Sequence, residues 1–322
     1  MINPLPEKLI RDFASKVKKL VVVEELDSII EDHCRKLGLD VVGKDIFPLV
    51  DEFSQNLIAE KLGIATNPGK ALDEAIPARP PVMCAGCPHR GLFYTLSKKK
   101  VTVLGDIGCY TLGANAPLSS MDTTVCMGAS VSGLHGFKRA GGENCVAVIG
   151  DSTFMHTGLS GLIDIAYNGS ESTVIILDNS ITGMTGHQEN PTTGYNIKGE
   201  PARKIDLEAL CKSLGISRVR VVDPYNIEEC EAAVTEEMGI GEPSVIIARR
   251  PCVLLKSVKQ NHPIKADKEK CASCTACMKI GCPAMSMRDK KADINPTLCV
   301  GCELCTQLCR FGALTPMKKS QI

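Results

Sequence analysis

The sequence has no excess of charge of either sign and no long apolar run. Its 322 residues carry 37 Lys and Arg against 37 Asp and Glu, so no overall field attracts nucleic acid or a membrane surface. No apolar stretch approaches the roughly 20 residues of a membrane-spanning helix. The first residues lack the basic and apolar regions of a signal peptide. We therefore expect a cytoplasmic protein with neither nucleic acid nor membrane among its partners, and 44% apolar content is enough for two or three domains.

Cysteine, in contrast, is abundant, with 17 in the chain. Without an export signal, so many thiols indicate a reducing compartment. Eight of them form two runs near the end, Cys271-Ala-Ser-Cys274-Thr-Ala-Cys277-Met-Lys-Ile-Gly-Cys282 and Cys299-Val-Gly-Cys302-Glu-Leu-Cys305-Thr-Gln-Leu-Cys309. A C-x2-C-x2-C triplet with a trailing cysteine is typical of bacterial ferredoxins, in which each 4Fe–4S cluster takes its fourth ligand from the other run.

This pattern assigns two 4Fe–4S clusters, the first to Cys271, Cys274, Cys277 and Cys309 and the second to Cys282, Cys299, Cys302 and Cys305. Two details depart from the bacterial pattern: four residues, not three, precede Cys282, and Arg310 follows the last cysteine. The alternatives are structural zinc, which usually takes pairs of CxxC, and disulfides. The segment from Lys259 onward has eleven Lys and Arg against five Asp and Glu, which we expect to offset cluster charge.

Three domains are expected along the chain. Residues 1–70 indicate a helix over 6–18, a strand over 20–24 and helices over 27–37 and 47–62. A single strand among helices is too little for a parallel sheet, so we interpret this segment as the remnant of a preceding α/β domain. Turn-rich residues 65–70 and Pro-rich residues 76–81 form a linker.

Residues 71–258 alternate strands and helices. Short apolar runs predict strands over 101–104, 145–149, 173–177, 219–222 and 244–248, with helices between most of them, for example over 159–167, 207–214 and 227–238. Strands of this kind are buried on both faces and indicate a doubly wound parallel sheet, whose sites lie beyond the carboxyl ends of the strands. A small two-cluster ferredoxin domain, residues 259–322, follows.

Polar residues follow two of the expected strands. Gly150-Asp151-Ser152-Thr153 comes after the strand over 145–149, and Asn179 after the next one. The Asp151 carboxylate, the Asn179 amide and the Ile181 carbonyl can bind one Mg²⁺, and a helix starting near Thr157 would aim its N–H groups at an anion. The alternative is two ordinary turns with polar caps. The pattern resembles the diphosphate motif of thiamine diphosphate enzymes, Gly-Asp-Gly followed later by Asn, with Ser152 at its last glycine.

Four further cysteines lie near the expected sheet edge and could hold a third 4Fe–4S cluster: Cys84, Cys87, Cys109 and Cys252. Taken alone, Cys109 and Cys252 would more often be buried small hydrophobes. We place the remaining cysteines in that ordinary buried class, namely Cys34, Cys126, Cys145, Cys211 and Cys230.

Several segments together resemble one family. The large (alpha) subunits of indolepyruvate:ferredoxin oxidoreductases are similar to the segment from Pro80-Pro-Val-Met-Cys-Ala-Gly-Cys-Pro-His-Arg90 through Thr185-Gly-His-Gln188, and to the cysteine-rich tail. The wider family is the 2-oxoacid:ferredoxin oxidoreductases. Val21-Val-Val-Glu-Glu25 also matches, so the resemblance covers nearly the whole chain. It places a third cluster at the four positions above and adds Gly128 to the cofactor-binding residues.

The resemblance implies a reaction and its partners. A 2-oxo acid, indolepyruvate or another aryl pyruvate, is decarboxylated with thiamine diphosphate and Mg²⁺, coenzyme A takes the acyl group, and 4Fe–4S clusters pass electrons to ferredoxin. The family subunit normally begins with a pyrimidine-binding domain whose Glu activates the cofactor. Because that domain is absent here, we expect a partner chain to supply it, or the sequence to be part of a longer gene, and a small beta subunit to join. Glu24 and Glu25 fit better as helix-start residues than as substitutes.

Two histidines are candidate catalytic residues, His89 beside the CxxC loop and His187 in the loop 183–194, which we expect to close over cofactor and substrate. Other substrates in the same family, pyruvate or branched 2-oxo acids, stay open. A non-redox thiamine-dependent decarboxylase would share the Asp151 and Asn179 site, but it has no use for the tail cysteines. A pure electron-transfer protein would keep the clusters and lose the thiamine site.

Overall fold

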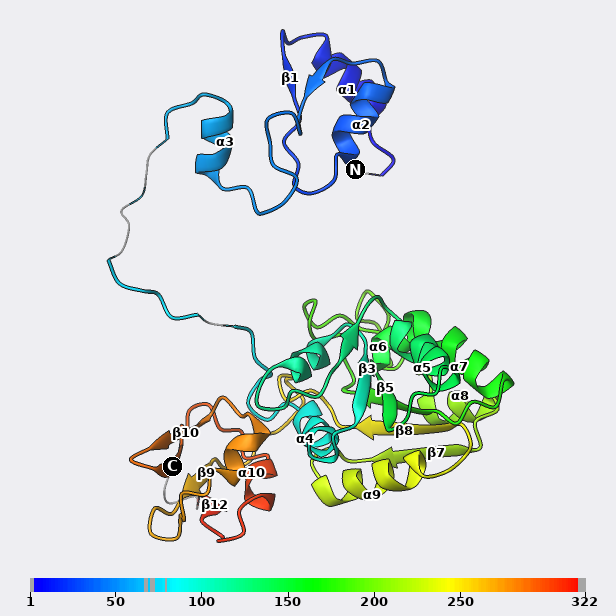
Figure 1. The fold of residues 1–322 in the computed structure, drawn as a ribbon, viewed down its shortest axis with the longest axis vertical. Helices are drawn as coiled ribbons and strands as arrows, with labels where there is room; N and C mark the ends of the chain where they lie inside the picture. The colour runs from blue at the N-terminus through cyan, green and yellow to red at the C-terminus, as the bar shows by residue number, and fades with distance from the viewer. Residues whose placement is uncertain (1–2, 67–68, 70–72, 79, 318–322) are drawn as a thin grey trace. The chain divides into compact units, whose positions relative to one another are not determined.

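The structure is a computed structural model that describes residues 3–66, 69, 73–78 and 80–317. The chain divides into two compact units, Met1–Ala78 and Arg79–Ile322 (Figure 1). Each unit has its own hydrophobic core. The predicted cofactor-binding residues and the predicted cluster cysteines all belong to the second unit.

The first unit pairs two very short strands with three helices: α1 (Glu7–Ala14), β1 (Leu20–Val21), α2 (Ile29–Lys36), β2 (Val41–Val42) and α3 (Gln55–Lys61). The strands are parallel, so the prediction of a single strand was wrong, because two valines are too short a run to register as a strand. The helix predicted over 47–62 begins only at Gln55, where the Ser54 hydroxyl accepts a hydrogen bond from the Leu57 N–H. The Glu24 carboxylate accepts hydrogen bonds from the N–H groups of Ile30 and Glu31, as expected of a helix-start residue.

The second unit is built on a six-stranded parallel sheet. Its strands run in the spatial order β4 (Thr123–Thr124), β3 (Thr102–Gly105), β5 (Cys145–Gly150), β6 (Thr173–Asp178), β8 (Ser244–Arg249), β7 (Arg218–Val222). Five of these strands lie within a residue or two of their predicted bounds. β4 was not predicted from the sequence, because it has only two residues and no apolar pattern.

Helices cover both faces of this sheet (Figure 1). α4 (His89–Lys99) and α9 (Ile227–Met238) bury Phe93 and Val234 against one face. α5 (Ala129–Arg139), α7 (Leu159–Tyr167) and α8 (Leu207–Ser213) bury Leu134 and Leu162 against the other. Because both faces are covered, β5 and β6 are buried along their whole length, which explains their mainly apolar sequences. The predicted doubly wound fold is confirmed.

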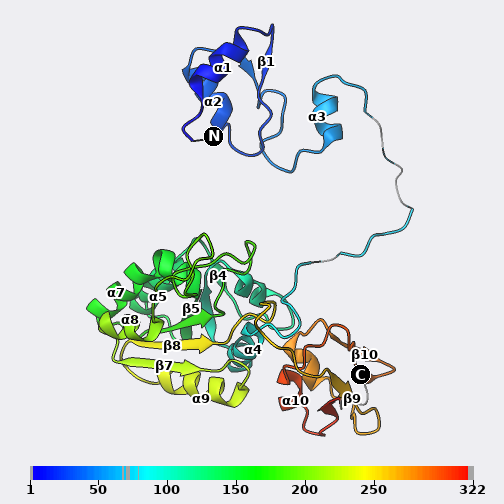
Figure 2. The ribbon, with the colours of Figure 1, turned by 180° about the vertical axis from the view of Figure 1, so that it is seen from behind.

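The cysteine-rich tail forms a small domain with its own apolar core around Ile264, Ile280 and Leu304. β9 (Ile264–Ala266) pairs antiparallel with β12 (Leu314–Pro316), and β10 (Met285–Arg288) with β11 (Lys291–Ile294). Two short helices complete the domain, η3 (Ala276–Ile280) and α10 (Leu304–Gln307). η3 contacts α4, so the tail packs beside that helix (Figure 2). The predicted domain boundary at residue 258 stays a prediction.

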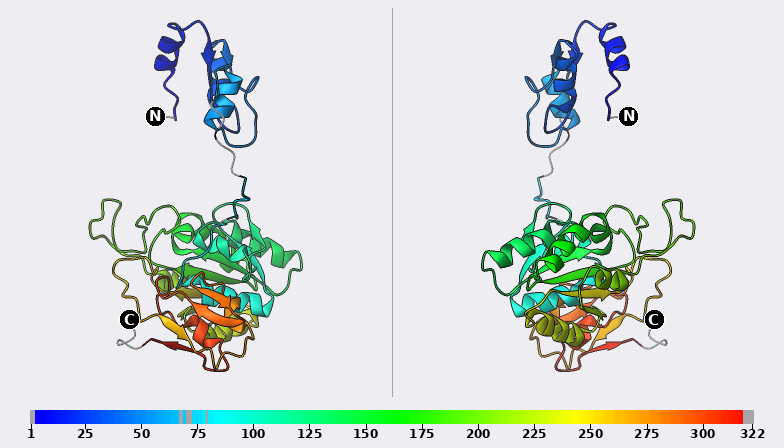
Figure 3. Two further views of the ribbon diagram at one scale, coloured as in Figure 1. Left: turned by 90° about the vertical axis from the view of Figure 1, so that its left-hand side faces the viewer. Right: turned by 90° about the vertical axis from the view of Figure 1, so that its right-hand side faces the viewer.

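The connection between β6 and α8 is the longest of the sheet domain and extends outward from it (Figure 3). It begins with residues 179–188, which line or border the candidate site described below. Within the ranges that the structure describes, none of the helices combines the length and the apolarity needed to cross a membrane.

Candidate cofactor and cluster sites

Asp151 stands at the point where β5 ends and a helix begins. Gly150 has an extended backbone and α6 (Asp151–Thr153) follows it directly. A single π-helical turn, η2 (Phe154–Gly158), then leads into α7. The helix was predicted to start near Thr157, which was wrong, because the π turn continues the helix back to the strand. The N–H groups at the helix start therefore belong to residues next to Asp151, at the end of a helix where an anion would be stabilised.

The Asp151 carboxylate is buried, with 2% of the residue exposed. One oxygen accepts a hydrogen bond from the N–H of Ser152 (2.7 Å) and the other from the N–H of Ser180 (3.1 Å). Burial, and then the charge of Asp178, raise the pKa of Asp151 to about 7. Asp178 has its own partner, because Arg249 Nε donates to it at 2.8 Å.

No Lys or Arg in the described part of the chain forms an ion pair with Asp151. A buried carboxylate without a cation is energetically costly, and a divalent cation would remove that cost. Oxygen ligands are the ones that Mg²⁺ prefers, and Asn179 and Ile181 line the same pocket as Asp151. The residues present therefore fit a magnesium ion.

One pocket of about 140 Å³ collects most of the predicted cofactor residues: Gly150, Asp151, Ser152, Thr153, Asn179 and Ile181. Its other walls include Met127, Leu177 and Met184. Gly128 lies behind the wall and does not line the pocket. It has φ +86°, and a Cβ there would lie 2.7 Å from the Thr157 carbonyl oxygen, so only glycine suits the position.

The two candidate histidines differ in position. His89 begins α4, is buried and lines the pocket. Burial lowers the pKa of His89 to about 4, so its ring is neutral near pH 7. The ring meets Tyr110 edge-on, with centroids 6.1 Å apart. His187 is exposed, on a short hairpin closed by Thr182 and Gln188, and the structure does not bring it to the pocket.

Two residues at the site were missed from the sequence. Asp106 is fully buried, and one of its oxygens accepts hydrogen bonds from the N–H groups of Gly128 (2.9 Å) and Ser130 (3.2 Å) and from the Ser130 hydroxyl (2.9 Å). It thereby caps the start of α5. Tyr110 lines the pocket, and its hydroxyl donates to the Ile107 carbonyl at 2.8 Å. An acidic residue directly after a buried strand was the available signal for Asp106.

The four cysteines considered for a third cluster lie within electrostatic reach of one another. Cys109 begins η1 (Cys109–Ala114), just after β3, and lines the cofactor pocket. Burial, then the neighbouring thiols of Cys252 and Cys84, raise the pKa of Cys109. Burial raises the pKa of Cys87 to about 12, with further contributions from Cys84 and Cys109. The Cys252 N–H donates to the Asn179 carbonyl at 2.9 Å, so this group of thiols borders the candidate magnesium site.

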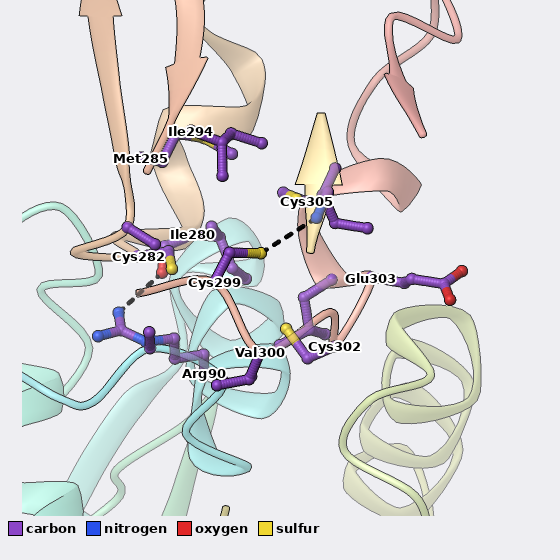
Figure 4. Close-up of a pocket in the computed structure, with 15 residues that line it drawn as sticks. Arg90, Ile280, Cys282, Met285, Ile294, Cys299, Val300, Cys302, Glu303 and Cys305 are labelled. Atoms are coloured by element: carbon purple, nitrogen blue, oxygen red, sulfur yellow. Dashed lines mark hydrogen bonds between the residues drawn. The ribbon is translucent and has the colours of Figure 1, made fainter. Parts of the chain in front are cut away.

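The eight tail cysteines surround two apolar cavities, four to each, in the sets predicted from the sequence. One cavity is lined by Cys282, Cys299, Cys302 and Cys305 together with apolar side chains such as Ile280 and Met285 (Figure 4). The other is lined by Cys271, Cys274, Cys277 and Cys309. Backbone N–H groups donate to the sulfurs of Cys299 (3.3 Å), Cys271 (3.4 Å) and Cys309 (3.3 Å). Four thiols, apolar walls and N–H donors to sulfur fit a 4Fe–4S cluster in each cavity.

The remaining cysteines mostly follow expectation. Cys34, Cys145, Cys211 and Cys230 are buried. Cys126 is exposed, so its placement among the buried cysteines was wrong. It lies between β4 and α5 next to Val125, which is 80% exposed.

Two family models match the parts described above. Residues 106–248 match "Thiamine pyrophosphate enzyme, C-terminal TPP binding domain", and residues 292–315 match "4Fe-4S binding domain". The fold and the sites thus define the class: a C-terminal domain of the thiamine pyrophosphate enzymes joined to a 4Fe–4S ferredoxin-like domain.

Individual relatives narrow the class. The indolepyruvate oxidoreductase subunit IorA of Archaeoglobus fulgidus is 39% identical, over 99% of this chain and 55% of the relative. The 2-oxoglutarate synthase subunit KorB of the same organism is 28% identical, over 56% of this chain and 77% of the relative. A solved 2-oxoglutarate:ferredoxin oxidoreductase from Magnetococcus marinus aligns with a TM-score of 0.48 at 17% identity, covering 56% of this chain and 68% of that one.

The chain spans about half the length of the curated indolepyruvate oxidoreductase subunits that it matches. Within that span the match is nearly continuous and covers 99% of the chain. The chain is therefore similar over nearly its whole length to the IorA subunits of indolepyruvate oxidoreductases, as its motifs indicated.

Proposed function

We propose that this chain provides the diphosphate-binding and electron-transfer half of a thiamine diphosphate-dependent 2-oxo acid:ferredoxin oxidoreductase. One observation carries the proposal: Cys109 lines the same pocket as Asp151 and Asn179, and it also belongs to the group of four thiols at the sheet edge. A cofactor in the pocket would therefore lie next to an electron acceptor held by those thiols.

In this proposal, Mg²⁺ binds the Asp151 carboxylate, the Asn179 side-chain oxygen and the Ile181 carbonyl, with diphosphate oxygens completing its shell. Gly150, Ser152 and Thr153 border the diphosphate at the helix start. Thiamine diphosphate, when bound, supplies carbanion stabilisation, while the protein supplies binding, orientation and electrostatics. Neutral His89, on the pocket wall, is available to hydrogen-bond the substrate or cofactor. Gly128 does not line the pocket, but it fixes the backbone position of Met127, which does.

Electrons would leave the pocket along a line of cysteine groups. Cys84, Cys87, Cys109 and Cys252 would hold the cluster beside the pocket. Ala85 and Gly86 lie between the first two of these cysteines and border the cavity of Cys282, Cys299, Cys302 and Cys305. A cluster in that cavity would therefore be the next electron acceptor. A cluster in the cavity of Cys271, Cys274, Cys277 and Cys309 would then pass the electrons to ferredoxin.

The pyrimidine half of the cofactor would contact a second chain or chain segment that carries the activating Glu. Large apolar side chains at the pocket, Met127 and Met184, are 39% and 47% exposed, as expected of a surface that a further domain covers. The small beta subunit, coenzyme A and ferredoxin complete the assembly. The names of the relatives favour indolepyruvate as substrate, with release of its acyl-CoA.

The test is to assemble the chain anaerobically with the subunits that complete it and to supply thiamine diphosphate, Mg²⁺, coenzyme A and ferredoxin. A panel of indolepyruvate, phenylpyruvate, pyruvate and a branched 2-oxo acid is then compared by ferredoxin reduction and CO₂ release. We expect one CO₂ to be released for every two electrons that reduce ferredoxin. We expect an aryl pyruvate to be the best substrate. CO₂ release without ferredoxin reduction would instead identify a non-redox decarboxylase, and reduction by no 2-oxo acid would contradict the proposal.

A further inference from the structure

A buried arginine, Arg90, lies between two of the cysteine groups. Only 3% of it is exposed, and it sits in the first turn of α4, three residues after Cys87. Its guanidinium donates to backbone carbonyls on both sides. On its own side these belong to Met83 and Cys84 (3.0 Å), and in the ferredoxin domain to Ile280 (3.1 Å) and Gly281 (2.7 Å). Figure 4 shows it beside the cavity of the second cysteine run.

Arg90 has no carboxylate partner among the residues that the structure describes. An arginine side chain keeps its proton in proteins, and a buried charge without a partner is strongly unfavourable. Its Nε donates to the Cys84 carbonyl on one side, and its side chain lines the cavity of Cys282 and Cys302 on the other. Thiolates that ligate iron–sulfur clusters would provide the negative charge that the carboxylates do not.

The contact falls in the part of the first cysteine run that is one residue longer than the bacterial pattern. Gly281, which ends η3, has φ +67°, and a Cβ on it would lie 3.2 Å from Arg90 Nη1 and 2.9 Å from Pro117 Cδ. Gly281 is among the four residues before Cys282 where the bacterial pattern has three. The longer spacing presents two successive carbonyls, of Ile280 and Gly281, to one guanidinium.

A second contact fixes the same loop. The Tyr225 hydroxyl donates to the Gly86 carbonyl, and Gly86 borders the cavity beside Val300. Gly86 has φ +68°, so a side chain at this position would be strained. Because the loop is already anchored at Gly86, the charge of Arg90 can be tested apart from its part in packing.

We propose that Arg90 is a positioning residue that supplies the positive charge between the Cys84 and Cys87 loop and the cluster of Cys282, Cys299, Cys302 and Cys305. The proposal rests on the proposed function, in that both groups hold iron–sulfur clusters. Reduction adds one negative charge to a cluster, and a fixed positive charge nearby in a medium of low dielectric stabilises that state. One electron would pass from one cluster to the next, with no bond forming or breaking at Arg90.

The test compares Arg90→Gln, which removes the charge, with Arg90→Lys, which keeps it; both lose the planar fork of donors. The midpoint potentials of the clusters in the full chain are measured by anaerobic redox titration with electron paramagnetic resonance. The signals are assigned with Cys302→Ser and Cys274→Ser. In Arg90→Gln we expect the reduced-to-oxidised ratio of the Cys302 cluster at a fixed potential to fall about tenfold, a shift of about 59 mV for one electron. Arg90→Lys should stay near wild type.

Lys291 provides the matched control, because its ammonium donates to the Cys271 carbonyl at 2.6 Å beside the other tail cavity. Lys291→Gln should leave the Cys302 cluster unchanged. If Arg90→Gln fails to assemble while Arg90→Lys assembles with wild-type potential, the charge is required and the proposal stands. If both variants assemble with the wild-type potential, shift it equally, or both fail to assemble, Arg90 only packs and the proposal is overturned. Failure of the proposed function looks different, because the wild-type chain would then either lack clusters or hold clusters that no 2-oxo acid reduces.

Discussion

The carboxylate of Asp151 accepts a hydrogen bond from the backbone N–H of Ser180, with 3.1 Å between the two atoms. This bond joins the tip of β5 to the tip of β6, which pair in parallel up to Gly150 and Leu177. Ser180 has φ +59°, a turn that follows Asn179 directly. The candidate magnesium ligands are therefore held by the backbone of the sheet and by one carboxylate that reaches across it.

Replacement of Asp151 tests the magnesium site. In the assembled enzyme, Asp151→Ala should weaken Mg²⁺-dependent binding of thiamine diphosphate roughly 100-fold, because the cation loses its charged protein ligand. Asn179→Ala removes a neutral oxygen and should weaken binding roughly tenfold. Isothermal titration with the cofactor measures both. Asp164→Ala, on the exposed side of α7, is the control, and wild-type affinity in the Asp151 variant would refute the site.

Iron analysis tests the third group of cysteines. We expect the full chain, reconstituted anaerobically, to carry about twelve iron atoms, of which the two tail clusters account for about eight. Cys109→Ser should lose about four and slow electron transfer out of the pocket. Cys126→Ser, at an exposed cysteine outside the group, should lose none. A wild-type chain with only about eight iron atoms would show that Cys84, Cys87, Cys109 and Cys252 hold no cluster.

Asp106 should matter for stability, because it satisfies donors at the start of α5. Asp106→Ala leaves the buried N–H groups of Gly128 and Ser130 without an acceptor, which should lower the free energy of unfolding by about 2–4 kcal/mol. Anaerobic denaturant unfolding near pH 7 measures this change. Glu143→Ala, at an exposed position, should change it by no more than about 0.5 kcal/mol. A similar small change in the Asp106 variant would mean that water replaces the cap.

His89 should make stability depend on pH. Its folded-state pKa of about 4 lies below the ordinary value of 6.5, so the unfolded chain binds a proton below pH 6.5 that the folded chain excludes. Stability from this residue is full above pH 6.5 and falls as pH drops toward 4, by about 1.4 kcal/mol for the first unit below 6.5. Between pH 7.5 and 5.5 the wild type should therefore lose about 1.4 kcal/mol more than His89→Gln. Exposed His187→Gln should behave as wild type, and equal losses in all three would contradict the burial of a neutral ring.

Local patterns predicted most of the sheet domain and the grouping of the cysteines. Buried parallel strands such as β5 and β6 are mainly apolar, so their sequence shows approximately where they begin and end. Ligand spacing places cysteines in sets before any fold is known, and the structure gathers the tail cysteines in those same sets around two cavities.

Features that depend on contacts distant in sequence were missed. β2 and β4 have two residues each, and only pairing with a neighbour makes them strands. The start of the helix at Asp151 depends on a π turn, which no residue pattern in the sequence predicts. Asp106 and Arg90 are ordinary charged residues in the sequence, and their importance comes from partners 22 to 191 positions away. Such partners become visible only once the chain is folded.

The most direct test of the account follows the electrons in a single turnover. The assembled enzyme, with thiamine diphosphate and Mg²⁺ bound, is mixed with indolepyruvate without ferredoxin, frozen after set times and measured by electron paramagnetic resonance. We predict that signals of reduced 4Fe–4S clusters grow with CO₂ release, and that they are absent in Asp151→Ala and delayed in Cys109→Ser. Release of CO₂ while every cluster stays oxidised would contradict the claim that the pocket and the cysteine groups form one electron-transfer site.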